Sequence, residues 1–299
     1  MNREFRKTTF KHLLKTSGLI SDLVEKSFAK PVMNYKALGT VGRGTTVMVP
    51  ENPVKSDGSV DIIFQIRGIA GGDIKTANAM GKNAVIVTAE AGGLGSKENL
   101  AAYGSPAFIN EAVGKIIGTL KQNFPDKNIH LGKLTVSSFS GGGGATAQLL
   151  MNRSALPKGS EPTKFVFIDG LHADPNGNVM KAVVDYAKEV KDNPKAGELS
   201  IIHTAVVPGS YASTTQVADH ILGQVGMKRQ STNQPQGQGD EVHPTSIAQN
   251  GGLKIVQLYD TIQPYMAKDP RSGEVKPNVP GTAGWQHMKS LEFGLRNSM

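Results

Sequence analysis

The sequence predicts an α/β fold: a mainly parallel sheet of about eight strands, helices on both faces, and an extra helix at the N-terminus. Three observations support this prediction. Short apolar runs alternate with segments of helical periodicity, which is the pattern of strand–helix–strand units. Hydrophobic residues make up 38% of the 299 residues, enough for a sizeable core. Glycine occurs 35 times, often directly after an apolar run, where the chain has to turn tightly.

The expected elements follow in chain order. Residues 35–39 and 45–49 flank a turn with two glycines and indicate an antiparallel hairpin. Further strands are expected at 60–66, 84–89, 134–139, 164–168, 200–207 and 253–259. Helices are expected at 106–124, 145–152, 179–190, 214–225 and 287–295. Because strands and helices alternate, each helix is expected to connect two parallel strands by a crossover, which predicts a mainly parallel sheet.

Residues 1–34 are predicted to form an amphipathic, basic helix. The first 30 residues contain seven Lys and Arg against three acidic residues, and so hold four of the eight net positive charges. Two interpretations stay open: a helix packed on the domain with a solvated basic face, or an arm that touches an anionic partner or membrane surface. Residues 35–299 are expected to form one domain, in which the polar stretch 228–245 is a long surface loop.

Composition excludes several classes of function. The chain has no cysteine, which rules out disulfides, thiolate metal sites and cysteine nucleophiles. The sequence contains no run of 18 apolar residues, so no membrane-spanning helix is predicted. It also contains no cluster of His, Asp and Glu with the spacing of metal ligands. The net charge of +8 comes without the basic–aromatic pattern of nucleic-acid binding. A cytoplasmic location is the default expectation, although a phage or exported protein would look the same.

One segment between an expected strand and an expected helix points to catalysis. Residues 135–145 read TVSSFSGGGGA. A nucleophile on such a turn needs small residues two positions before and after it, because strand and helix pass close together there. Ser140 meets this condition with Ser138 and Gly142, whereas Ser138 itself has a valine two positions before it. Ser140 is therefore the expected nucleophile, and Gly141 the expected backbone donor to an oxyanion at the helix start.

This turn, together with the order of elements from about Tyr35 onward, resembles the α/β-hydrolase superfamily of serine hydrolases. The resemblance implies a nucleophile elbow, an oxyanion hole and a catalytic triad in the order Ser, Asp, His. It assigns the acid to Asp169, after the strand that follows the nucleophile helix, and the base to His287, before the last helix. Asp174 and Asp260 stay open as alternative acids.

Further site residues are expected around this triad. The resemblance implies a second oxyanion donor in the Gly-rich loop after the third expected strand, at Ile69 or Ala70. The expected substrate-lining residues are Arg67, Trp285, Tyr103 and His172. For Arg67 two roles stay open, a clamp on a substrate carboxylate or phosphate and a structural ion pair. This sequence also departs from the family pattern, since the family's Gly-x-Ser-x-Gly has become Ser-x-Ser-x-Gly and its His-Gly has become Arg-Gly.

The leading hypothesis is a serine hydrolase that cleaves a carboxylic ester, or an amide as a close variant, through an acyl-enzyme. It needs no cofactor and no metal. The substrate is expected to be a small-molecule or cell-envelope-type ester, and the oligomeric state is not predicted. Two alternatives stay open. Residues 142–147 fit a loose Gly-x-Gly-x-x-Ala dinucleotide fingerprint, which would make the protein an NAD(P)-dependent oxidoreductase. The scaffold could also serve a non-catalytic binding protein.

Overall fold

The computed structural model describes most of the chain from Tyr35 onward. The described residues are 35–42, 44–67, 82–89, 91, 96–205, 212–232, 243–258, 267–268, 275–276, 287, 290–291, 293–295 and 297. The basic helix expected at 1–34 lies outside them, as do residues 233–242 of the expected polar loop.

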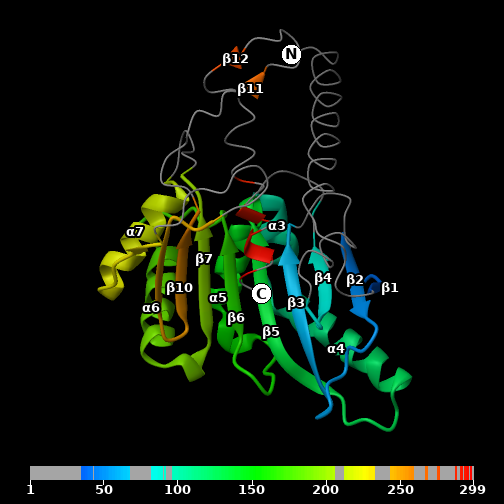
Figure 1. Cartoon of the computed structure of the whole chain (residues 1–299). Helices are drawn as coiled ribbons and strands as arrows, with labels where there is room; N and C mark the ends of the chain where they lie inside the picture. Colours follow the sequence, from blue (N-terminus) through cyan, green and yellow to red (C-terminus); the bar gives the residue numbers. More distant parts are fainter. Residues whose placement is uncertain are drawn as a thin grey trace.

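A 10-stranded, mixed sheet runs through the molecule (Figure 1) in the order β1-β2-β4-β3-β5-β6-β7-β10-β9-β8. Its strands are β1 Tyr35–Gly39, β2 Thr45–Pro50, β3 Ser59–Ile66, β4 Val85–Ala89, β5 His130–Phe139, β6 Lys164–Ile168, β7 Glu198–His203, β8 Gln230–Ser231, β9 Ser246–Asn250 and β10 Leu253–Gln257. The six strands from β4 to β10 in that order are parallel, and both ends of the sheet are antiparallel. A separate short pair joins β11 Ala267–Lys268 to β12 Val275–Lys276.

The five α-helices that the structure describes pack on one face of this sheet, and a C-terminal helical segment packs on the other. The described α-helices are α3 Ser96–Tyr103, α4 Pro106–Asn123, α5 Gly143–Met151, α6 Asn178–Asp192 and α7 Thr214–Val225. All five contribute to one large hydrophobic cluster with alternate residues of the strands, such as Val85 and Val87 of β4. The residue between them, Ile86, belongs to a second cluster on the other face, which Leu291 and Leu295 of the C-terminal helical segment complete. This arrangement is the predicted α/β sheet with helices on both faces.

The sheet has more strands than the eight expected. The additional strands, β8 and β9, pair antiparallel at one edge, and β8 lies inside the stretch expected to be a loop. Both residues of β8 and the last two of β9 are exposed, so neither strand carries the continuous apolar run of a buried strand. The antiparallel hairpin of β1 and β2 is confirmed. Helix α3 was not expected, because its sequence SKENLAAY lacks an apolar stripe.

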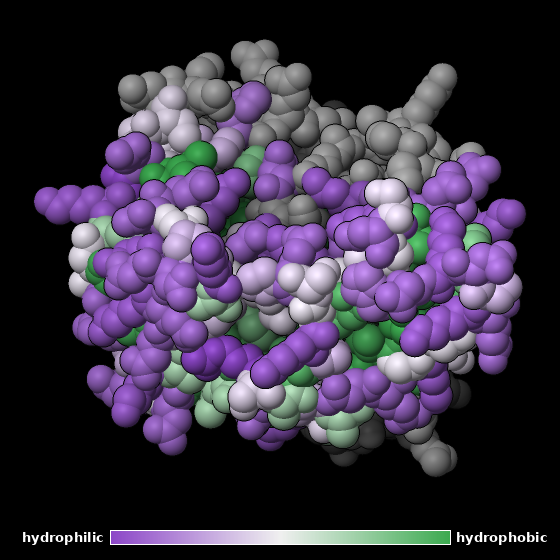
Figure 2. Space-filling view, turned by 90° about the horizontal axis from the view of Figure 1, so that it is seen from below, coloured by the Kyte–Doolittle hydropathy of each residue, from purple (hydrophilic) through white to green (hydrophobic). Residues whose placement is uncertain are grey.

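The parallel strands bring their carboxyl ends to a single edge of the sheet. Ile66 of β3 pairs with Ser138 of β5, and Phe139 pairs with Ile168 of β6. The residues that follow these strands are therefore neighbours, although about 70 and 30 residues separate them in the sequence. Seen from below (Figure 2), the surface is largely hydrophilic and is interrupted by smaller groups of hydrophobic residues. Among the described helices, none is long and apolar enough to cross a membrane.

Candidate active site

Three neighbouring strand ends share an unusual backbone conformation. Arg67, Ser140 and Asp169 have φ angles of 58°, 49° and 44°, and they are the non-glycine residues with positive φ in the described part of the chain. They follow β3, β5 and β6, which are adjacent in the sheet. The left-handed region is unfavourable for residues with a Cβ, and such conformations cluster at functional sites. The three residues together therefore mark a candidate site at the carboxyl edge of the sheet.

The turn at Ser140 is closely packed against both neighbouring strands. β5 ends at Phe139, a short 3₁₀ turn follows over Ser140–Gly142, and α5 begins at Gly143. A Cβ at Gly142 would lie 2.6 Å from the carbonyl oxygen of Ile66, and a Cβ at Gly143 would lie 1.7 Å from that of Gly170. Only glycine fits these positions without a shift of the backbone. The close approach explains why small residues surround Ser140.

Gly170 completes this packing from the side of β6. A Cβ there would lie 2.4 Å from the backbone oxygen of Ser140 and 2.8 Å from its backbone nitrogen. The glycine that follows the acidic residue thus leaves room for the turn that carries the hydroxyl. This contact was missed in the sequence, because a single glycine after a strand is too common to indicate a specific neighbour.

Substitution of Gly143 with alanine is expected to lower the free energy of unfolding by about 1–3 kcal/mol, since the new methyl group would overlap the Gly170 carbonyl. Gly144→Ala is the matched control, because a Cβ at Gly144 has nothing within 4 Å and the position is exposed. That control is expected to gain about 0.5–1 kcal/mol from the better helix propensity of alanine. Urea unfolding followed by circular dichroism measures both. Equal effects of the two substitutions would contradict the packing described here.

The Asp169 carboxylate is buried and held by four hydrogen bonds. The backbone N–H of Thr204 and the hydroxyl of Thr214 donate to Oδ1 at 3.1 and 2.7 Å. The hydroxyl of Thr204 donates to Oδ2 at 2.8 Å, and Nδ1 of His287 lies 2.6 Å from the same oxygen. These four contacts fill the lone-pair positions of an ionised carboxylate.

The same contacts determine the ionisation of Asp169. Burial by itself raises the pKa of this carboxyl group. The hydrogen bond and charge of His287 and the hydroxyls of Thr214 and Thr204 outweigh that effect and hold the pKa below its ordinary value. A group with a depressed pKa in the folded state is charged throughout the neutral range, so Asp169 faces His287 as a carboxylate.

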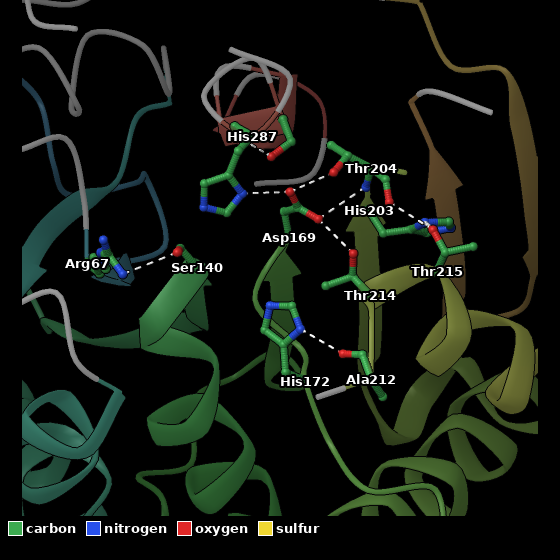
Figure 3. A network of polar contacts seen from close by, with 11 residues as sticks. Arg67, Ser140, Asp169, His172, His203, Thr204, Ala212, Thr214, Thr215 and His287 are labelled. Carbon is green, nitrogen blue, oxygen red and sulfur yellow. Dashed lines mark hydrogen bonds and ion pairs between the residues drawn. The ribbon is translucent and has the colours of Figure 1, made fainter. Parts of the chain in front are cut away.

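His287 lies between Asp169 and Ser140 in the fold (Figure 3). Its Nδ1 donates to Asp169, which leaves Nε2 as the acceptor in the neutral ring. Figure 3 shows Nε2 turned toward the side on which Ser140 lies. The ring packs against Phe139, with ring centroids 4.3 Å apart, and its side chain is 26% exposed. The His287 imidazole is therefore turned toward the side of the site where the Ser140 hydroxyl lies.

The Ser140 hydroxyl contacts an arginine on its other side. Nη1 of Arg67 donates to Ser140 Oγ at 3.2 Å, as the dashed line in Figure 3 marks. No hydrogen bond joins Ser140 to His287 among the described residues. Contacts of this kind are often open in an unliganded site and close when substrate binds.

The other residues expected at the site have different positions. His172 lies near Asp169 in Figure 3, and its Nδ1 donates to the Ala212 carbonyl at 3.0 Å. His172 is exposed at the surface, and partial desolvation of its ring lowers its pKa below the ordinary value. Gly141 follows Ser140 in the 3₁₀ turn, two residues before α5 begins. Asp174 is exposed, and its Oδ1 accepts the backbone N–H of Asn176 at 3.0 Å, as in a turn.

The side chain of Tyr103 is buried in the hydrophobic core. The residue is 1% exposed, and its hydroxyl donates to the backbone oxygen of Gly44 at 3.1 Å. Its burial beside Phe108 follows from its position at the end of α3, which was not expected in the sequence. The remaining expected site residues lie outside the described part of the chain: Ile69, Ala70, Asp260 and Trp285.

Thr204 and Thr214 were missed as site residues in the sequence. Thr204 directly follows β7 and Thr214 is the first residue of α7, so both reach Asp169 from the strand beside β6 and the helix that follows it. Thr215 extends the network: its hydroxyl donates to the Thr204 carbonyl at 2.8 Å and contacts Nδ1 of the buried His203 at 3.2 Å. A hydroxyl after a strand was the only available signal, and it is shared by many surface turns.

Two observations on the described residues concern the metal and nucleotide alternatives. No group of three or more His, Cys, Asp or Glu residues that could hold a metal ion occurs among them. Of the two glycines of the dinucleotide fingerprint, Gly142 packs against the carbonyl of Ile66, whereas a Cβ at Gly144 would have nothing within 4 Å. Asp169, which a nucleotide-binding protein would use for the ribose, has its carboxylate filled by protein donors.

The strand order and the sharp strand–helix turn at Ser140 are those of the α/β-hydrolase fold. No protein-family model matches the chain, and no curated protein does.

The chain matches several solved structures at low sequence identity, among them the following three. A thermostable esterase has a TM-score of 0.39 at 12% identity, over 86% of this chain and 62% of that one. The Mycobacterium tuberculosis protein MPT51 has a TM-score of 0.36 at 12% identity, over 64% and 85%. A Pyrobaculum calidifontis esterase has a TM-score of 0.42 at 11% identity, over 97% and 92%. The chain thus spans less than two thirds of the thermostable esterase.

Proposed function

We propose that the protein is a serine hydrolase which cleaves carboxylic esters of small molecules through a covalent acyl-enzyme. The observation that carries this proposal is the constellation at one sheet edge: a strained Ser140, a buried ionised Asp169, and His287 bonded to Asp169 with its second nitrogen on the serine side. Nucleophile, base and orienting acid are the three parts that such catalysis needs.

In the proposed reaction, Ser140 Oγ attacks the ester carbonyl carbon while Nε2 of His287 takes the hydroxyl proton. The carbonyl electron pair moves to oxygen, and the resulting oxyanion accepts a hydrogen bond from the backbone N–H of Gly141. When the carbonyl re-forms, the bond to the leaving alkoxide breaks and His287 returns the proton to it. Water, deprotonated by His287, then attacks the acyl carbonyl carbon. The bond to Ser140 Oγ breaks, His287 returns the proton to Oγ, and the carboxylic acid product leaves. Asp169 holds the imidazole in the Nδ1–H tautomer and stabilises its positive charge.

Closure of the gap between Ser140 and His287 is part of this proposal. The hydroxyl has to leave its contact with Arg67, or share it, when Nε2 approaches. In this proposal the hydroxyl rotates about the Cα–Cβ bond toward Nε2, and side-chain rotations of this kind are fast compared with turnover.

Stopped-flow hydrolysis of p-nitrophenyl butyrate tests the function. We expect a burst of about one nitrophenolate per chain followed by slower turnover, which is the kinetic signature of an acyl-enzyme. Pre-treatment with an alkyl fluorophosphonate is expected to abolish both phases. Neither burst nor turnover on a panel of p-nitrophenyl esters would contradict the proposal and favour a non-catalytic binding protein. Saturable tryptophan quenching by NAD(H) or NADP(H) would favour the oxidoreductase instead.

A further inference from the structure

The backbone of Arg67 is hydrogen-bonded to the sheet, while its side chain points to Ser140. Its backbone N–H donates to the Ala89 carbonyl of the adjacent strand β4 at 2.7 Å. The side-chain amide of Gln65 donates to the Arg67 carbonyl at 3.3 Å. With the backbone held from both sides and φ at 58°, the guanidinium reaches Ser140. A positive φ at a non-glycine residue costs conformational energy, and such residues cluster at functional sites. This conformation therefore points to a role for the Arg67 side chain.

The hydrogen bond from Arg67 to Ser140 places a charged donor directly on the expected nucleophile. A guanidinium is permanently charged and donates hydrogen bonds in a fixed plane. Its Nη1 lies 3.2 Å from the oxygen that would form the new bond to carbon. Because the other oxygens of the attacked carbon are neighbours of Oγ, a donor at this distance can reach the former carbonyl oxygen when that oxygen lies on the Arg67 side. In the ground state it meets a neutral hydroxyl, whereas in the tetrahedral intermediate it would meet a full negative charge.

We infer that Arg67 is a further catalytic residue, whose guanidinium donates a charged hydrogen bond to the oxyanion beside the Gly141 N–H. This inference rests on the proposed function. The interaction strengthens as charge develops on the former carbonyl oxygen, so it stabilises the transition state more than the bound ester. Arg67 transfers no proton. His287 still carries the serine proton to the leaving group, and the guanidinium remains protonated throughout.

The inference differs from recognition of an anionic substrate, the other role that an arginine in this position suggests. A clamp on a substrate carboxylate or phosphate acts equally in the ground state and the transition state, and so mainly affects KM. A donor to the oxyanion mainly affects kcat, and it acts on neutral esters as well as on charged ones. The two roles can therefore be separated by kinetics.

The test measures kcat and KM of Arg67→Gln and Arg67→Lys on neutral p-nitrophenyl butyrate and on the anionic mono-p-nitrophenyl ester of glutaric acid. We expect Arg67→Gln to lower kcat about 10²- to 10³-fold on both esters with little change in KM, the loss typical of a removed oxyanion donor. Arg67→Lys, which keeps the charge, is expected to lose less. Arg153→Gln is the matched control, because Arg153 pairs with Glu189 after the far end of α5.

Free guanidinium at millimolar concentration gives a second readout that does not depend on variant stability. It is expected to restore part of the kcat of Arg67→Ala and to leave wild type unchanged. An unchanged kcat of Arg67→Gln on the neutral ester would overturn the inference. A loss confined to the KM of the anionic ester would also overturn it, in favour of substrate recognition. Absence of Ser140-dependent turnover in wild type would instead overturn the proposed function itself.

Discussion

Replacement of Ser140 with alanine is expected to lower kcat for ester hydrolysis about 10⁶-fold, to the level left when a whole triad is removed. Alanine keeps the Cβ of serine, so the strained backbone at φ 49° and the glycine contacts around it stay as they are. The loss would therefore reflect the missing hydroxyl and not a rearranged turn. Initial rates on p-nitrophenyl butyrate, with the thermal unfolding midpoint of each variant, measure this effect.

Ser138→Ala is the matched control for that experiment. Ser138 lies two residues before the nucleophile and is fully buried, and its hydroxyl has no hydrogen-bond partner among the residues that the structure describes. Removal of this unpartnered hydroxyl is expected to leave kcat close to that of wild type. Turnover retained by Ser140→Ala but lost in Ser138→Ala would mean that the wrong serine has been assigned.

Substitution of His287 with alanine is expected to cause a loss of similar size, about 10⁶-fold in kcat. Without Nε2 no group accepts the Ser140 proton, and a neutral hydroxyl is a poor nucleophile. The double variant with Ser140→Ala is expected to be no worse than either single variant, because the two residues act as a unit.

His220→Ala provides the control for His287. His220 lies on α7 and is half-buried, on the helix whose first residue contacts Asp169. Its removal takes away one imidazole while the Asp169 contacts stay in place. We expect wild-type kinetics from this control. Additive losses in the Ser140 and His287 double variant would contradict a shared proton transfer.

The nucleophile turn could be predicted from the sequence because its determinants are local. A strand, a serine with small residues two positions away, and a run of glycines lie within eleven consecutive residues. The hydrogen bond between His287 and Asp169 spans 118 residues, and the expectation that they meet came from a family resemblance. Physical patterning in the sequence alone does not specify such a pair, since six other histidines are present.

The remaining contacts of the site depend on neighbours in space and leave no sequence pattern. Thr214 reaches Asp169 over 45 residues, and Arg67 reaches Ser140 over 73. Thr214 was an ordinary turn residue in the sequence, whereas Arg67 was expected to line the substrate site but not to contact Ser140. Gly142 could be interpreted from the sequence as the small residue that the turn requires, but Gly143 and Gly144 could not be told apart, because only the folded chain shows that Gly143 faces Gly170 and that Gly144 faces open space.

The most direct test is to map the covalent adduct that an alkyl fluorophosphonate leaves on the wild-type chain. Three serines lie within four residues at the end of β5, at 137, 138 and 140, so fragment-ion mass spectrometry has to resolve them. The site geometry predicts a single phosphonyl group on Ser140 Oγ, formed at a rate that falls sharply in His287→Ala. An adduct on another residue, or one formed equally fast without His287, would show that the hydroxyl and the imidazole do not cooperate.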